Sequence, residues 1–289
     1  MKLTGRGILI TGGSQGLGKA VAEACVDAGA DVFLCARGAA ELEETSRALR
    51  SRAAAGQRVE SRAADVSDPA SGGRLVAEAC ARLPHLTGVV NNAGINGAKG
   101  RLEDIAWEEW KRTIEINLFG TVLTCRAALP VLRRHGYGKI VNLSGGGATA
   151  PMPGFGAYAA SKAAVVRFTE TLAHEVAGTG IDVNAVAPGA LNTRMLDEVL
   201  AAGPEKVGKA YYEKALRQKA DGGAAPEKAA ALIVYLLSGE SDGITGRLLS
   251  AVWDPWPTLA GRAGELAKSD IYTLRRIVPQ DRGRNWDET

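Results

Sequence analysis

The sequence predicts a doubly wound α/β fold built on one parallel sheet. Three observations carry this prediction: short apolar runs recur along the 289 residues, longer segments of helical period separate them, and the first run leads into a glycine-rich turn. Strands that alternate with helices imply right-handed crossovers and a parallel sheet covered on both faces. Ligands of such folds bind beside the carboxyl ends of the strands, so residues that follow each run are the candidates for function.

The apolar runs locate the strands. They are expected at 8–11, 32–36, 59–63, 88–91, 140–144, 181–187 and 247–252. Helices fill the intervals between them. Residues 191–223 stand outside this alternation and carry apolar residues at helical spacing, so we expect either a flap over the substrate crevice or an ordinary packing helix.

Length and composition restrict the class of protein. An α/β fold of this size often forms one unit, so we expect a single catalytic domain at 1–252 with an extension at 253–289. The net charge is only +3 with both signs interspersed, which indicates no nucleic-acid partner. No long apolar stretch opens the chain, so a cytoplasmic protein without a membrane partner is expected. The 4 cysteines are scattered, and no metal site, disulfide or cysteine catalysis is expected.

A glycine-rich turn follows the first predicted strand and opens the next helix. It reads Thr11-Gly12-Gly13-Ser14-Gln15-Gly16-Leu17-Gly18. Glycines allow a sharp turn and a close approach to a pyrophosphate, while free amides and the helix dipole face the anion. Between a strand and a helix, this turn predicts a dinucleotide site. Its candidate cofactor-binding residues are Gly12, Ser14, Gln15, Gly16, Leu17 and Gly18.

The end of the second predicted strand indicates which dinucleotide binds. An acidic residue there would hydrogen-bond the 2′-hydroxyl of NAD, but the sequence has Ala36 followed by Arg37. A guanidinium offers a charged, planar fork that suits a phosphate, so Arg37 favours NADP over NAD. The alternative is a solvated surface arginine.

Tyr158 and Lys162 form the candidate catalytic pair. They lie four residues apart in a helical segment, which puts the phenol and the ammonium on one face. A tyrosine with a pKa near ~10 is a poor acid or base at neutral pH, but a close ammonium and a cationic nicotinamide would lower that pKa. Such a tyrosine can move the proton that hydride transfer to or from a carbonyl requires.

Together these motifs resemble the short-chain dehydrogenase/reductase family over residues 3–252. Further motifs match in order: Asp65-Val66, Asn91-Asn92-Ala93-Gly94, and Pro188-Gly189 with Thr193. The resemblance implies a Rossmann fold and an NAD(P)-dependent oxidoreductase that acts on a small-molecule carbonyl or secondary alcohol. It also implies a homodimer or homotetramer formed through long helices beside the active site.

The resemblance assigns roles to residues outside the glycine-rich turn. Asp65 and Val66 would contact the adenine, and Lys162 would hold the nicotinamide ribose. Asn117 would anchor a proton-relay water. The other cofactor-binding residues that it implies are Asn92, Ala93, Gly94, Pro188, Gly189 and Thr193.

The sequence departs from the family pattern thirteen residues before Tyr158, where Gly145 stands in place of a serine that hydrogen-bonds the substrate oxygen. Loss of such a donor commonly costs about 10²–10³ in rate. Neighbouring side chains of a regular strand face opposite ways, so Ser144 can replace the serine only if residues 145–147 bulge or turn. We therefore include Ser144 among the catalytic candidates on the hypothesis of a bulge.

Two functional alternatives stay open at this point. The first is a dinucleotide-binding protein that kept the fold and lost or altered its catalysis, as Gly145 suggests. The second is an epimerase or dehydratase that uses its nucleotide transiently. Neither the substrate nor the working direction follows from the sequence.

The extension begins with Trp253-Asp254-Pro255-Trp256-Pro257 and continues with several arginines. Aromatic residues and arginine suit contact surfaces. The extension is therefore expected to pack over the crevice or on a neighbouring subunit, or else to be a solvated appendage with an apolar anchor.

Overall fold

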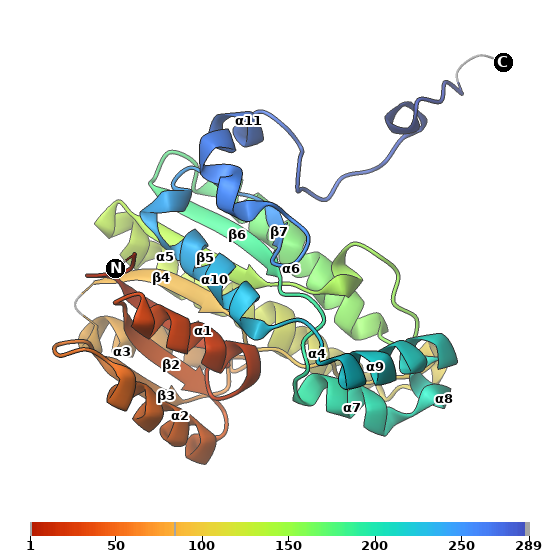
Figure 1. Cartoon of the computed structure of the whole chain (residues 1–289), viewed down its shortest axis with the longest axis horizontal. Helices are drawn as coiled ribbons and strands as arrows, with labels where there is room; N and C mark the ends of the chain where they lie inside the picture. The colour runs from red at the N-terminus through yellow and green to blue at the C-terminus, as the bar shows by residue number, and fades with distance from the viewer. Residues whose placement is uncertain (1, 84, 287–289) are drawn as a thin grey trace.

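Seven parallel strands form the centre of the molecule in a computed structural model that describes residues 2–83 and 85–286. Their order across the sheet is β3-β2-β1-β4-β5-β6-β7 (Figure 1). The strands are β1 (Gly7–Thr11), β2 (Asp31–Ala36), β3 (Val59–Ala63), β4 (Leu86–Asn91), β5 (Gly138–Leu143), β6 (Ile181–Ala187) and β7 (Leu248–Ser250). This is the doubly wound sheet that the sequence predicts, and every predicted strand end lies within two residues of the observed one.

Helices cover both faces of the sheet, so apolar side chains fill the strands on both sides. In β1, Ile8 and Ile10 enter one core and Leu9 enters the other. The first core lies under α1 (Gly16–Asp27), α2 (Ala39–Arg52) and α10 (Pro226–Leu237). The second lies under α3 (Pro69–Arg82), α5 (Gly120–His135) and α6 (Gly156–Glu175). The two cores hold the carboxyl ends of the strands in fixed register.

One helical stretch, Trp107–His135, is long and apolar enough to cross a membrane, with a mean hydropathy of 1.3 in its most apolar window. It comprises α4 (Trp107–Ile114), the π-helical turn η2 (Glu115–Phe119) and α5. Cys125, Ala128 and Leu132 of this stretch are fully buried in the second core. Its apolar character therefore matches its position against the sheet.

Three helices between β6 and α10 form the segment that the sequence singles out as a flap or a packing helix. They are α7 (Arg194–Ala202), α8 (Pro204–Val207) and α9 (Lys209–Asp221), and they lie together at one end of the molecule (Figure 1). Leu196, Val199, Val207 and Ala215 bury an apolar cluster of their own around Phe155. The segment is thus a small helical unit with its own core.

The chain after β7 first packs on the body. A 3₁₀ helix, η5 (Trp256–Arg262), and α11 (Ala263–Ala267) bury Leu259 and Leu266 in the first core. The ring of Trp256 lies 5.6 Å from that of Tyr235, centroid to centroid. The buried guanidinium of Arg247 donates to the carbonyl oxygens of Ser269, Ile271 and Leu266.

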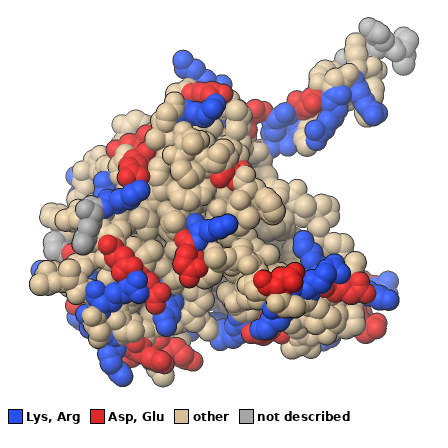
Figure 2. Space-filling model, viewed as in Figure 1, with Lys and Arg blue, Asp and Glu red and all other residues tan. Residues whose placement is uncertain are grey.

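Beyond residue 274 the chain leaves the body and projects outward (Figure 1). Ile277 and Trp286 are exposed in this arm, which also carries a short 3₁₀ helix, η6 (Pro279–Arg282). Figure 2 shows Lys and Arg side chains interspersed with Asp and Glu over this face, the arm included. The structure thus joins residues 253–274 to the domain, and only the arm extends from it.

Candidate active site

A cavity of about 1780 Å³ lies at the carboxyl ends of the strands. The neighbours of β1 are β2 and β4, so the direction of winding reverses there, which is where doubly wound sheets bind ligands. Every predicted cofactor-binding residue, from Gly12 to Thr193, lines this cavity, as do Ser144, Tyr158 and Lys162. Asn117 is the one predicted site residue that does not line this cavity.

The glycine-rich turn has the backbone that its sequence predicts. Gly12 and Gly16 have φ angles of 67° and 53°, a region that favours glycine. A Cβ at Gly18 would lie well within 3.0 Å of the Gly12 carbonyl oxygen, so a side chain there would force the turn open. Helix α1 begins at Gly16 with no side-chain cap and no acidic residue in its first turn. No side chain therefore competes for its first amides, and the turn fits a pyrophosphate.

Thr11 and Asn92 hold this turn against the end of β4. The Thr11 hydroxyl accepts hydrogen bonds from the amides of Asn92 and Ala93, both at 3.1 Å. The Asn92 amide group donates to the carbonyl oxygens of Thr11 and Gly12, both at 3.0 Å. Asn92 therefore shapes the turn with its side chain. Thr11 belongs to the motif, but its supporting role was not among the site predictions.

The end of β2 forms the part of the cavity where Arg37 was predicted to bind a phosphate. Arg37 is exposed and lines the cavity, and the described residues form no ion pair with it. Glu41, which belongs to no motif and was not predicted, lines the same region from the first turn of α2. Its carboxylate folds over Gly38 so closely that a Cβ at Gly38 would overlap it. A cation and an anion therefore lie beside the same site.

Asp65 is held by protein groups on both carboxylate oxygens. One oxygen accepts the Ser67 amide at 2.9 Å and the Ser67 hydroxyl at 2.6 Å, and the other accepts Arg112 at 2.7 Å. Burial opposes the charge, but the hydrogen bonds from Ser67 and Arg112 outweigh it and lower the pKa of Asp65. The side chain is an anchored anion at the wall where an adenine contact was predicted, and Val66 lies buried beside it.

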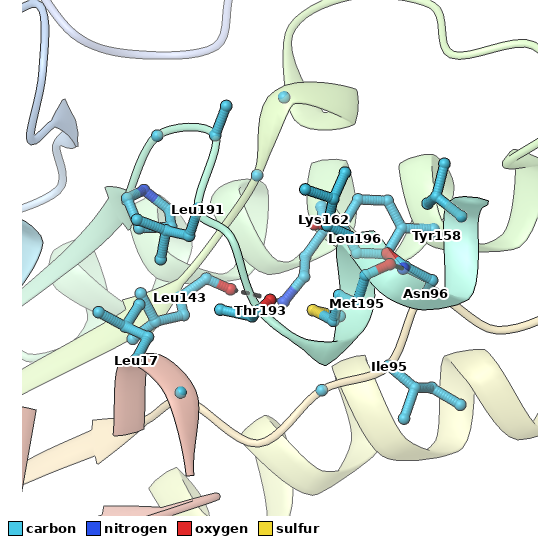
Figure 3. A pocket seen from close by; sticks show the side chains of 18 of the residues that line it. Leu17, Ile95, Asn96, Leu143, Tyr158, Lys162, Leu191, Thr193, Met195 and Leu196 are labelled. Atoms are coloured by element: carbon cyan, nitrogen blue, oxygen red, sulfur yellow. Dashed lines mark hydrogen bonds between the residues drawn. The ribbon is translucent and has the colours of Figure 1, made fainter. Parts of the chain in front are cut away.

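Tyr158 and Lys162 meet deep in the cavity. The Lys162 ammonium lies 5.8 Å from the centroid of the Tyr158 ring and donates to the Leu143 carbonyl oxygen at 2.8 Å (Figure 3). Burial lowers the pKa of Lys162 to about 8. Burial also raises the pKa of Tyr158 to about 12, and repulsion from Tyr211 adds to the rise. Among the protein's own groups desolvation therefore dominates, and the predicted lowering of the phenol pKa, which also includes the charge of a cationic nicotinamide, stays a prediction.

Asn117 lies in the π-helical turn and is almost fully buried. Its amide group donates to the Ile95 carbonyl oxygen at 2.9 Å and the Ser161 hydroxyl at 3.0 Å, and its oxygen accepts the Ile95 amide at 2.8 Å. A Cβ at Gly94 would lie 3.2 Å from the Asn117 oxygen and 3.5 Å from the Lys162 nitrogen. Asn117 thus ties the loop after β4 to α6 immediately behind Lys162.

The bulge that was expected to re-aim Ser144 is absent. Gly145 is extended, with φ −174° and ψ 174°, and the Ser144 amide still bonds the Val186 carbonyl oxygen at 2.8 Å, as in a regular ladder. The Cα–Cβ direction of Gly145 points at the Tyr158 hydroxyl, so Ser144, its neighbour on an extended backbone, faces the opposite way. The buried Ser144 oxygen has no hydrogen-bond partner among the described residues. Ser144 therefore does not take the place of the missing serine.

The opposite wall comes from the segment after β6. Pro188, Gly189 and Thr193 line it, and a Cβ at Gly189 would lie 2.7 Å from the Val252 side chain. Asn96 joins this wall to the loop after β4 by donating to the Met195 carbonyl oxygen at 2.7 Å (Figure 3). Asn96 and Tyr211, which also lines the cavity from α9, were not predicted, because neither belongs to a motif.

A doubly wound sheet, a glycine-rich turn shaped for a pyrophosphate and a half-buried tyrosine beside a buried lysine together define a dinucleotide-dependent oxidoreductase. Residues 6–203 match the short chain dehydrogenase family, and the chain belongs to that family.

Known relatives agree with this assignment. A 3beta-hydroxysteroid dehydrogenase 1 from Eggerthella lenta is 38% identical over 249 residues, which cover 86% of this chain and 92% of the relative. The crystal structure of levodione reductase superposes with a TM-score of 0.79 at 30% identity, covering 91% of this chain and 99% of the other. A variant of the actinorhodin polyketide ketoreductase, solved with NADPH, gives 0.77 at 30% identity over 86% of this chain and 97% of the other. The chain is thus an enzyme similar to proteins named as dehydrogenases and reductases.

Proposed function

We propose that this enzyme transfers hydride between NADP(H) and a carbonyl or secondary alcohol, with Tyr158 as the general acid or base. The observation that carries the proposal is the pair of half-buried Tyr158 and buried Lys162 at the carboxyl end of β5. It lines the same cavity as a glycine-rich turn whose first helical amides have no side-chain cap. When bound, the nicotinamide supplies or accepts the hydride; the protein positions the reactants and moves the proton.

The protonation states support this division of roles. The pKa of Tyr158, raised to about 12 by burial, keeps the phenol protonated at neutral pH and ready to donate to a carbonyl oxygen. The pKa of Lys162, lowered to about 8, leaves the ammonium mostly charged at neutral pH. Its position favours contact with a nicotinamide ribose and stabilises negative charge left on the phenol. We propose Asn117 as the residue that positions Lys162 and a proton-relay water through the loop after β4.

Arg37 supports NADP over NAD as the cofactor. Its exposed guanidinium lines the cavity at the end of β2 and forms no ion pair with the described residues. It can therefore meet a 2′-phosphate without first breaking a bond within the protein. The polyketide ketoreductase that resembles this chain was solved with NADPH, which is in line with this preference.

The substrate end of the cavity favours a bulky apolar ketone or alcohol. Met152, Leu196, Val199 and Val207 line it around Tyr158, so the residues nearest the catalytic phenol are mostly apolar. Relatives named for hydroxysteroids, levodione and a polyketide point to cyclic ketones and alcohols. The segment 191–223 carries several of these residues, and we propose it as the substrate flap.

We further propose a cytoplasmic homodimer or homotetramer with no membrane partner. Its interface would lie along the helices beside the active site. Trp107 and Phe119 support this, because they are large apolar side chains exposed on α4 and η2 by 66% and 50%.

The test is a Tyr158→Phe variant assayed with NADPH and a panel of cyclic ketones such as 2-decalone and 3-ketosteroids. We expect turnover to fall by at least about 10²-fold, because the phenol oxygen supplies the proton, while NADPH still binds. Retention of full turnover would remove Tyr158 from the mechanism. A wild-type protein that binds NADPH and turns over no substrate of the panel or its alcohols would favour the alternative of lost catalysis.

A further inference from the structure

The active site lacks a side chain where β5 would present a second hydrogen-bond donor. Gly145 stands there, and its Cα–Cβ direction ends at the Tyr158 hydroxyl. Ser144 faces away, and its oxygen is buried. The carbonyl oxygen of a substrate at Tyr158 would therefore meet no hydroxyl from β5. A single donor leaves developing negative charge on that oxygen poorly stabilised.

Tyr211 brings a second phenol to the same part of the cavity from a different element. It lies on α9, lines the cavity with Tyr158, and packs against the same apolar cluster. Phe155, three residues before Tyr158, contacts the Tyr211 ring, so the two tyrosines share one region of the cavity. Tyr211 therefore reaches the region of the reacting oxygen from the flap side.

The Tyr211 ring is held in place by the helix that carries Tyr158. Its centroid lies 5.0 Å from that of Phe155, with the two planes tilted by 56°. Phe155 is fully buried and precedes α6, so it is fixed relative to Tyr158 three residues later. A ring with few rotatable bonds, packed on a fixed neighbour, presents its hydroxyl at low entropic cost.

The Tyr211 hydroxyl is free to bind a ligand. The described residues offer it no hydrogen-bond partner, whereas the side-chain amides of Asn96 and Gln218, which also line the cavity, already donate to backbone carbonyl oxygens. Burial raises the pKa of Tyr211, so the phenol stays protonated and can donate at neutral pH.

We propose that Tyr211 is a further catalytic residue, whose hydroxyl donates to the substrate oxygen the hydrogen bond that no side chain at Gly145 can give. This inference rests on the function proposed above. During reduction the hydride goes to the carbonyl carbon and the Tyr158 proton goes to the oxygen, while Tyr211 keeps its proton and lends only a hydrogen bond. Residues 191–223 thereby complete the site with a side chain from α9.

Tyr211→Phe and Tyr212→Phe test this inference as a matched pair. Tyr212 is the next residue of α9, is half-buried in the same cluster, and does not line the cavity. With the panel ketone that the wild type reduces fastest, we expect Tyr211→Phe to lower kcat by about 10²-fold, since the bond strengthens as charge develops on the oxygen. Tyr212→Phe should stay within about twofold of the wild type, in line with the small effect of most substitutions away from such a site.

Two controls separate the outcomes. Phenylalanine keeps the packing on Phe155, so both variants should retain the Tm and the Kd for NADPH of the wild type; equal loss of kcat in both would indicate a structural effect of α9 and overturn the inference. Unchanged turnover in Tyr211→Phe, with Tyr158→Phe inactive, would overturn the inference and leave the proposed function standing. Full activity of Tyr158→Phe, or no turnover by the wild type, would remove the proposed function and this inference together.

Discussion

The hydroxyl of Tyr158 occupies the space that a side chain at Gly145 would fill: a Cβ on the extended backbone of Gly145 would lie well within 3.0 Å of the phenol oxygen. The missing side chain therefore determines where the catalytic hydroxyl stands. Tyr158 is half-buried, and its ring packs against the apolar cluster around Phe155. Glycine at this position leaves the observed place of the phenol free, and a larger residue would require the Tyr158 hydroxyl to shift.

We predict that Gly145→Ala lowers kcat by about 10–10²-fold, because the added methyl group displaces the phenol from its position for proton transfer. Steady-state kinetics with a cyclic ketone measure the effect. The matched control is Gly146→Ala, where a Cβ would meet no atom within 4 Å, and this variant should change kcat far less. If both variants kept wild-type kcat, the position of the Tyr158 hydroxyl in this structure would not be the reactive one.

Arg37→Ala should weaken NADPH binding by about 10–10²-fold and leave NADH binding unchanged, because it removes charge-assisted hydrogen bonds to the 2′-phosphate. Glu41→Gln should strengthen NADPH binding, because it removes a negative charge beside the site of the 2′-phosphate. Calorimetric titration of the wild type and each variant with NADPH and with NADH measures the affinities. Arg47→Ala is the charge-matched control, since Arg47 is exposed on α2 and does not line the cavity. If Arg47→Ala lost as much NADPH affinity as Arg37→Ala, the effect of Arg37 would come from the net charge of the protein and not from contact with the 2′-phosphate.

Local patterns in the sequence were enough to predict the sheet, and most residues that they nominate for the site line one cavity. Short apolar runs predict strands because a parallel sheet is buried on both faces, and the turn around Gly12 is a continuous motif. The Ser144 bulge failed because the strand ladder continues to Val186. The direction of the Tyr158 pKa shift depends on burial, which no spacing reveals. Tyr211 lies in a helix without a motif, and only the folded flap brings it to Tyr158.

Lys162→Met should stabilise the fold by a net of about 2 kcal/mol at neutral pH while lowering turnover. The pKa of Lys162 falls from 10.5 to about 8 on burial, and each unit corresponds to about 1.4 kcal/mol. The lost hydrogen bond to the Leu143 carbonyl offsets about 1 kcal/mol of this gain. Below pH 8 the folded and unfolded lysine are both charged, so the wild type bears the full burial penalty.

The pH dependence gives this prediction a second check. Between about pH 8 and 10.5 the unfolded lysine keeps a proton that the folded one has lost, so wild-type stability rises with pH relative to the variant. Urea unfolding at a series of pH values measures the difference. If the difference in unfolding free energy between the wild type and Lys162→Met stayed constant from pH 7 to 10.5, the pKa of Lys162 would not be lowered in the folded protein.

The segment after β7 divides at residue 274 into a part that stabilises the fold and a part that does not. Removing 253–289 takes Leu259 and Leu266 out of the first core, at about 1.5–3 kcal/mol each, and leaves the buried Arg247 guanidinium without its carbonyl acceptors. We expect this truncation to lose at least about 5 kcal/mol of unfolding free energy. Removing only 275–289 deletes the projecting arm and should leave the urea midpoint and the ketone kinetics unchanged. Sedimentation of both truncated proteins gives the mass of the assembly. If removal of 275–289 lowered both the urea midpoint and this mass, the arm would pack on a second copy of the chain.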